Sequence, residues 1–124
     1  MLFLNRWGPA LLWMVVIYSF SANSDPFQVV PQNITLPDEI IGRIAHVFEF
    51  AILAILISRA QIKENDNNSI SVPRITIFAT SYGIFDELHQ SWIPERAFQL
   101  LDLGLDILGV LIGLSLFALY KSRV

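Results

Sequence analysis

The sequence predicts an all-α, polytopic membrane protein, with four transmembrane helices in one bundle and both termini in the cytoplasm. Hydrophobic residues make up 54% of the 124 residues and charged residues only 15%, which is more apolar than an ordinary soluble domain. Four apolar stretches are each about long enough to cross a hydrocarbon core as a helix. They cover about residues 3–22, 40–58, 72–90 and 102–120 of a single domain, residues 1–124.

Composition also excludes several kinds of site. The chain contains no cysteine, so disulfides, thiolate metal ligands and cysteine nucleophiles are ruled out. It contains no basic block with interleaved aromatic residues, and nucleic-acid binding is therefore not expected. Ser81 and Ser91 lack the strand–turn–helix setting of a hydrolase nucleophile. Any chemistry is therefore expected from carboxylates, histidines and arginines.

The first apolar stretch, residues 3–22, is predicted to cross the membrane as a helix. A cleaved signal peptide is the alternative, because Arg6 is placed like a charged n-region and residues 19–22 resemble a cleavage site. A proline-punctuated polar loop follows from Pro26 to Glu39. Its last residues, a proline followed by two acids, suit the first turn of the next helix.

The second stretch carries Arg43, His46 and Glu49 at a spacing of three, which places them on one helical face. The polar residues 59–71 after it are predicted to form an exposed loop. The third stretch opens with Pro73 at a first-turn position and ends in the polar sequence DELHQ, residues 86–90.

A short connector with Pro94, Glu95 and Arg96 leads into the fourth stretch, which begins with Asp102 and Asp106. Further along, residues 109 and 113 form a GxxxG pair. In an apolar helix such a pair allows a neighbouring helix to approach closely. The pair predicts helix packing and carries no information on activity.

Orientation follows from the basic residues. With four spans, six of the eight Lys and Arg residues share one side: Arg6, Arg59, Lys63, Arg74, Lys121 and Arg123. Arg43 and Arg96 lie on the other. Because cytoplasmic loops carry an excess of basic residues, this distribution predicts cytoplasmic termini and an outward-facing polar cluster.

Three of the predicted helices direct polar groups to one depth. Ionisable groups in membrane segments are costly unless they face one another or water, and they are by default a functional hypothesis. The candidate ligand-binding residues are His46, Glu49, Asp86, His89, Gln90, Arg96, Asp102 and Asp106. For Asp102 alone the favoured explanation is structural, because an acid in a first helical turn complements the helix dipole. Glu87 is predicted to be a solvated residue at a helix end.

Three functions fit this cluster. In the first, which needs no cofactor, Arg96 and Arg43 bind the phosphate or carboxylate of an anionic envelope lipid or glycolipid headgroup, since arginine binds such groups bidentately. In the second, a metal-dependent membrane enzyme, the (i, i+3) pairs His46–Glu49 and Asp86–His89 hold a divalent metal. In the third, a non-catalytic partner subunit, the polar groups only lock the bundle, which assembles with itself or another membrane protein.

The sequence resembles the VanZ-like family of membrane proteins over nearly its whole length. The similarity lies in residues 86–90, in Pro94 and Arg96, in Asp102, Asp106 and Gly109, and upstream in His46 and Glu49. The resemblance implies a bacterial multi-pass protein of the plasma (inner) membrane, with a founding member linked to resistance to the glycopeptide antibiotic teicoplanin. It implies no particular reaction. Glu95 stands where the family usually has glycine, and Asp106 where asparagine is common.

Overall fold

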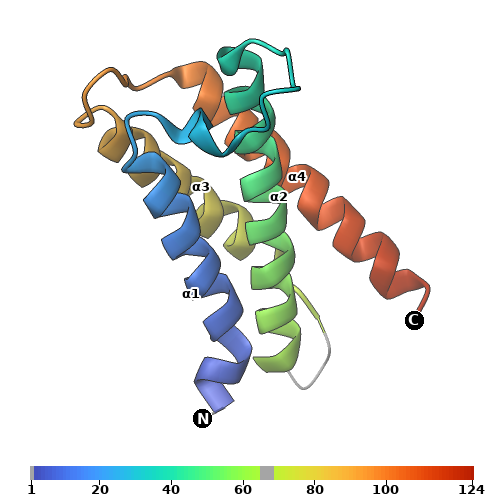
Figure 1. Ribbon diagram of the computed structural model, residues 1–124. Helices are drawn as coiled ribbons and strands as arrows, with labels where there is room; N and C mark the ends of the chain where they lie inside the picture. The colour runs from blue at the N-terminus through green and yellow to red at the C-terminus, as the bar shows by residue number, and fades with distance from the viewer. Residues whose placement is uncertain (1, 65–68) are drawn as a thin grey trace.

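The computed structural model describes residues 2–64 and 69–124, which form an all-helical structure (Figure 1). Its elements are α1 (Leu2–Ser21), the short 3₁₀ helix η1 (Pro26–Val29), α2 (Asp38–Glu64), α3 (Val72–Gln90) and α4 (Leu100–Ser122). No strand occurs within these two ranges. The predicted fold class, all-α, is confirmed.

The helix boundaries follow the local sequence signals. α2 begins at Asp38, directly after a proline and with two acids in its first turn, as the sequence predicts. α2 continues to Glu64, so the prediction of a loop from Arg59 was wrong over residues 59–64. Polar residues such as Arg and Gln are good helix formers, and Ala60 and Gln61 are buried, which extends the helix. Residues 65–68 of that predicted loop lie outside the described residues.

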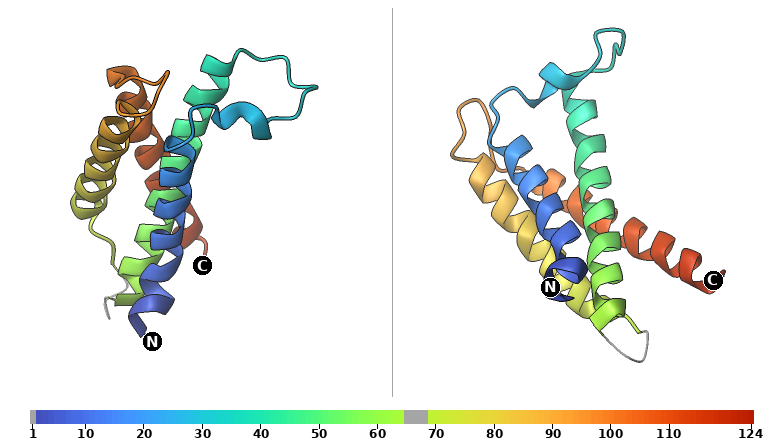
Figure 2. Two further views of the ribbon diagram at one scale, coloured as in Figure 1. Left: turned by 60° about the vertical axis from the view of Figure 1, so that its left-hand side comes forward. Right: turned by 60° about the horizontal axis from the view of Figure 1, so that its bottom comes forward.

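The four α-helices share two ends. Figures 1 and 2 show the α1–α2 and α3–α4 connections at one end, and the start of α1 with the C-terminal end of α2 and the start of α3 at the other. α4 crosses α2 and diverges from the other helices toward its C-terminus (Figure 1). The end with the two long connections carries the C-terminal end of α3 and the N-terminal ends of α2 and α4, where the candidate residues are concentrated.

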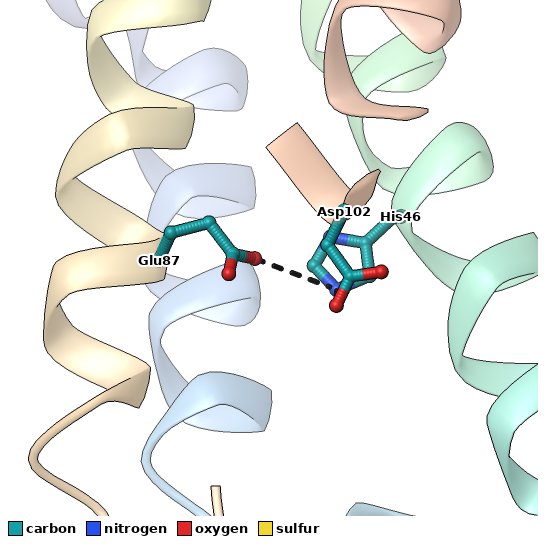
Figure 3. Close-up of side chains that lie close together, drawn as sticks. All are labelled: His46, Glu87 and Asp102. Atoms are coloured by element: carbon teal, nitrogen blue, oxygen red, sulfur yellow. Dashed lines mark ion pairs between the residues drawn. The ribbon is translucent and has the colours of Figure 1, made fainter. Parts of the chain in front are cut away.

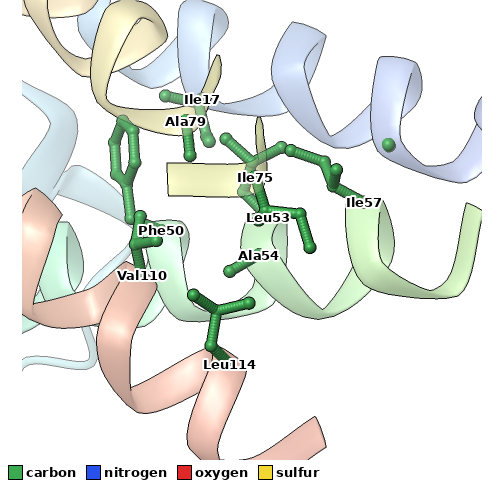
Figure 4. Packing of buried hydrophobic residues seen from close by; sticks show 10 residues of the cluster. Ile17, Phe50, Leu53, Ala54, Ile57, Ile75, Ala79, Val110 and Leu114 are labelled. Carbon is green, nitrogen blue, oxygen red and sulfur yellow. The ribbon is translucent and has the colours of Figure 1, made fainter. Parts of the chain in front are cut away.

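α2 is the central helix of the core. Its residues Phe50, Leu53, Ala54 and Ile57 are fully or almost fully buried (Figure 4). The other three helices contribute the remaining members of this core: Ala10 and Ile17 from α1, Ile75 and Ala79 from α3, and Val110 and Leu114 from α4. α1 is therefore an integral part of the packed structure.

α2 packs most extensively against α4, and two glycines make this possible. A Cβ atom at Gly109 would lie closer than 3.0 Å to the backbone oxygen of Val47. A Cβ atom at Gly113 would lie equally close to the backbone oxygen of Ala51. The close helix approach predicted from the GxxxG pair is confirmed.

Two helices in the described part of the chain are long and apolar enough to cross a membrane: α2 over Asp38–Ile62 and α4 over Leu100–Ser122. α1 and α3 do not reach the same criterion. Asn5 and Arg6 make the start of α1 more polar, and α3 carries charged residues near both ends. The structure therefore supports membrane-spanning character for two of the four predicted helices.

Candidate functional site

The centre of the candidate site is His46, a buried residue of α2. Its Nδ1 atom lies 2.8 Å from Oδ1 of Asp106, which α4 contributes. Its other ring nitrogen, Nε2, faces two further carboxylates: Oε1 of Glu87 at 3.8 Å and Oδ2 of Asp102 at 3.7 Å. Figure 3 shows Glu87 reaching from α3 toward the His46 ring, with the Asp102 carboxylate beside it. Two helices, α3 and α4, thus bring three carboxylates to one imidazole of α2.

Two carboxylate oxygens of this cluster are buried without a hydrogen-bond partner in the described structure: Oε1 of Glu87 and Oδ2 of Asp106. The Glu87 side chain is 0% exposed, and its second oxygen accepts a hydrogen bond from the Gln99 backbone N–H at 3.1 Å. Burying an ionised carboxylate is costly unless it is paired or hydrogen-bonded. The cluster therefore has an excess of negative charge that one imidazolium can balance only in part.

A second polar network lies beside the first and joins α1 to α3. The Ser21 hydroxyl donates a hydrogen bond to Oδ1 of Asp86. The Gln90 amide donates to Oδ2 of Asp86 at 2.9 Å and is 3.1 Å from the Ser21 hydroxyl. Both Asp86 oxygens are thus partnered, and the network holds the ends of the two helices together.

Arg96 extends this network to the α3–α4 connection. Its Nη2 donates to Oε1 of Gln90 at 3.0 Å, and its Nη1 donates to the backbone oxygens of Phe20 at 3.2 Å and Asn23 at 3.3 Å. Phe20 lies in the last turn of α1 and Asn23 two residues beyond its end, where backbone acceptors are not fully used by helical hydrogen bonds. All three acceptors are neutral. The preceding Glu95 has φ 66°, the left-handed region that favours glycine.

Two adjoining hollows, of about 250 and 300 Å³, open beside these networks. His46, Gln90 and Arg96 line both of them, together with residues of η1. The residues particular to the first hollow are largely apolar, apart from Ser21 and Glu49: Phe20, Val29, Val30, Ile41 and Ala45. Those particular to the second are largely polar: Ser24, Asp38, Glu39, Arg43, Glu95, Ala97, Gln99 and Asp102.

The structure brings most of the predicted site residues into these two networks and hollows. His46, Asp102 and Asp106 meet directly, while the others lie in the second network or line a hollow: Glu49, Asp86, Gln90 and Arg96. His89 lies elsewhere. Its ring stacks on Tyr18 of α1, with centroids 4.4 Å apart and planes 17° apart, and it lines neither hollow.

Glu87 is the site residue that the sequence prediction missed. It was predicted to be solvated, but it is fully buried and faces His46. A signal for this exists in the sequence of α3, because Ala79 and Gly83 precede Glu87 at successive spacings of four. The buried face of α3 includes all three, so small residues mark the face that carries the acid inward.

The four residues of the predicted metal set do not gather in one place. His89 stacks on α1, and the two oxygens of Asp86 are used within the second network. In the part of the chain that the structure describes, one group of metal-ligating type has its ligand atoms within 4.8 Å of one another: His46, Glu87 and Asp102. Only His46 belongs to both sets.

Comparison with known proteins identifies the family. No curated protein and no solved structure matches the chain. The family model described as VanZ/LLP1 matches residues 4–121, nearly the whole sequence. This match covers α2 and α3, nearly all of α1 and α4, and every residue of the two networks, and it confirms the resemblance noted from the sequence. The chain belongs to the VanZ/LLP1 family.

Proposed function

We propose that this protein binds the headgroup of an anionic lipid or glycolipid of the bacterial cell envelope, in the two hollows beside Arg96. All four helices cross the plasma membrane in this proposal, with both termini in the cytoplasm and the hollows facing outward. Membership in the VanZ/LLP1 family is consistent with a cell-envelope protein linked to glycopeptide resistance. Binding of an envelope lipid is one way for a small membrane protein to influence susceptibility to such antibiotics.

The observation that carries the proposal is the environment of Arg96. Its guanidinium lies on the wall common to both hollows and donates hydrogen bonds to neutral oxygens: two backbone carbonyls and the Gln90 amide. No carboxylate within residues 2–62 and 69–124 forms an ion pair with it. Arg43, by contrast, is paired with Glu39 at 2.5 Å. Arg96 is thus a fixed cation without a direct counter-ion, as an anion-binding arginine should be.

The lining of the hollows supports an amphiphile as the ligand. The first hollow has an apolar wall that includes Phe20, Val29 and Ile41, whereas the second is lined mainly by polar residues. A lipid presents this combination at the junction of its headgroup and its chains. Small-molecule sites likewise combine an apolar lining with a few placed polar groups.

The test uses the full-length protein, extracted in a mild detergent and delipidated. Native mass spectrometry measures binding of added phosphatidylglycerol, with zwitterionic phosphatidylcholine as the reference lipid. We expect phosphatidylglycerol adducts at least several-fold more abundant than phosphatidylcholine adducts. Arg96→Lys should abolish most of this preference, because an ammonium does not reproduce the planar fork of donors.

Arg74→Lys is the matched control, since Arg74 is exposed near the start of α3, at the opposite end of the bundle. It should bind phosphatidylglycerol like the unmodified protein. Thermal unfolding and gel filtration establish that both variants are folded. Equal binding of the two lipids, or full retention of the preference in folded Arg96→Lys, would refute the proposal.

One observation favours a structural role for part of the predicted set. Both oxygens of Asp86 accept hydrogen bonds from Ser21 and Gln90, which ties α1 to α3. In the proposed function Asp86 therefore positions Gln90, and through it Arg96, and does not itself contact the ligand.

A further inference from the structure

We infer that His46, Glu87 and Asp102 form a binding site for one divalent transition-metal ion, of which Zn²⁺ is the best fit. The inference goes beyond the proposed lipid binding. Its test uses the metal ion without any lipid, so the two proposals can fail independently. It also replaces the metal set predicted from the sequence, of which it keeps only His46. Its basis is the arrangement of three ligand atoms from α2, α3 and α4.

The distances fit a common ion. Zinc lies about 2.0–2.2 Å from nitrogen and oxygen ligands, so two ligand atoms of one ion are at most about 4.3 Å apart. Nε2 of His46 is 3.8 Å from the Glu87 oxygen and 3.7 Å from the Asp102 oxygen. One ligand atom from each of the three residues lies within 4.8 Å of the other two. The three atoms therefore surround one position.

Nε2 of His46 lies at ion-pair distance from both carboxylate oxygens but forms a hydrogen bond with neither. Separations of 3.7 and 3.8 Å are too long for hydrogen bonds, so Nε2 donates a proton to neither carboxylate at this geometry. Oε1 of Glu87, in a side chain that is 0% exposed, has no hydrogen-bond partner in the described structure and points at His46 (Figure 3). A buried carboxylate oxygen without a donor requires a cation or a proton. The unpartnered Glu87 oxygen is an observation separate from the residue types of the group, and it indicates a ligand between the three side chains.

Asp106 contacts the other ring nitrogen of His46, Nδ1. Its Oδ1 lies 2.8 Å from Nδ1 of His46. With a metal ion bound, this carboxylate would accept the Nδ1 proton, and the Nε2 lone pair would then be free to bind the ion. Metal-bound histidines almost always donate their other ring N–H to such an acceptor, which fixes the tautomer and the ring orientation. The contact with His46 identifies this role for Asp106; the spacing between Asp102 and Asp106 in the sequence does not predict it.

The donor set selects the class of ion. One imidazole with two carboxylates offers nitrogen and hard oxygen ligands, and imidazole favours Zn²⁺ over Mg²⁺ or Ca²⁺. Two carboxylate charges also balance the charge of a divalent ion. The Asp102 side chain is 13% exposed and lines the second hollow, which supplies a route for the ion and a position for a further ligand.

The experiment loads the chelator-treated, full-length protein in detergent with Zn²⁺ alone and measures bound metal and affinity by calorimetry and elemental analysis. We expect one Zn²⁺ per chain, a rise in Tm on loading because the ion binds only the folded protein, and no comparable effect of Mg²⁺. Glu87→Gln and Asp102→Asn keep the side-chain shapes and should lower the affinity by more than 10-fold. Asp106→Asn should lower it by about 10–100-fold, as expected for a residue that orients a ligand.

Glu39→Gln is the matched control, because Glu39 is an exposed acid that lines the same hollow and is not in the group. It should bind Zn²⁺ like the unmodified protein. If Glu87→Gln fails to fold, the partly exposed Asp102 decides the question through Asp102→Asn. A folded protein that binds no Zn²⁺, or folded Glu87→Gln and Asp102→Asn variants that bind it as tightly as Glu39→Gln, would overturn the inference.

Discussion

Gly109→Ala tests whether the α2–α4 contact requires the absence of a side chain, and Gly104→Ala is its control on the same helix. At Gly109 the new methyl group would lie closer than 3.0 Å to the backbone oxygen of Val47. At Gly104 nothing lies within 4 Å of the new atom. The two variants make the same chemical change in the same helix, and they differ in what the methyl group meets.

The expected free-energy difference follows from two opposing terms. Replacing glycine by alanine in a helix stabilises it by about 0.8–1.0 kcal/mol, and both variants share this gain. Inserting a methyl group into a tightly packed contact typically costs about 1–3 kcal/mol, which only Gly109→Ala incurs. Backbone cannot rotate away as a flexible side chain can, so the helices themselves must separate. Gly109→Ala should therefore be about 1–3 kcal/mol less stable than Gly104→Ala.

The assay is reversible unfolding of the detergent-solubilised protein by added denaturing detergent, followed by far-UV circular dichroism, with Tm as a second measure. Gly104→Ala should be as stable as the unmodified protein or more stable, and Gly109→Ala should be less stable than Gly104→Ala. Equal stability of the two variants would refute the reasoning, since it would mean that α2 and α4 do not approach as closely as the glycine geometry requires.

Three further variants test individual contacts, each by Tm and unfolding free energy in the same detergent. Glu95→Gly should stabilise the protein by up to about 1 kcal/mol, because an L-residue in the left-handed region costs about 1–2 kcal/mol and glycine loses part of this gain through chain entropy. Glu95→Ala keeps the strain and should change the stability little. A less stable Glu95→Gly variant would contradict the reasoning. Tyr82→Phe removes a hydrogen bond of 2.5 Å to a backbone oxygen of α1 and should lower the unfolding free energy by about 0.5–1.5 kcal/mol. Tyr120→Phe, at an exposed position, should have no measurable effect. Equal effects of the two variants would argue against the α1–α3 contact. Ser21→Ala removes the hydroxyl that donates to the buried Asp86 and should lower the unfolding free energy by about 1–3 kcal/mol. The exposed Ser19 hydroxyl donates to a carbonyl of its own helix, so Ser19→Ala should change the stability by no more than about 0.5 kcal/mol. An unchanged stability of Ser21→Ala would show that Ser21 does not contribute to the second network.

The helices could be predicted from the sequence because each is an apolar run that begins or ends at a polar or proline-containing segment. Proline and two acids mark the start of α2, and Pro73 marks the first turn of α3. The end of α2 could not be predicted in the same way. Hydropathy marks where a segment suits a membrane, whereas residues 59–64 are polar and helical at once. The predicted membrane segment therefore ends at residue 58, whereas the helix that contains it continues to Glu64.

The candidate site was predictable as a region and only partly as a set of contacts. The spacing of three placed His46 on one polar face of its helix, and the polar groups were predicted to share one depth; the structure has His46 and Asp106 in contact. Glu87 and His89 are both ionisable and stand two positions apart in the sequence, on different faces of α3. The choice between them depends on which face packs against α2 and α4, which is a property of the tertiary structure. The small residues Ala79 and Gly83 were the informative signal.

The packing seam of α4 and the His46 cluster depend on each other. Asp106, Gly109 and Gly113 are all buried and recur at spacings of three and four, so they lie on one face of α4, against α2. The glycines let the two backbones approach, and the acid one turn earlier can then reach the imidazole at 2.8 Å. A methyl group at Gly109 that separates the helices must also lengthen this contact and release the His46 ring. Gly109→Ala should therefore weaken Zn²⁺ binding although Gly109 is not one of the three ligands, while Gly104→Ala should leave Zn²⁺ binding unchanged. Tight binding in Gly109→Ala would mean that the cluster holds its geometry without the seam.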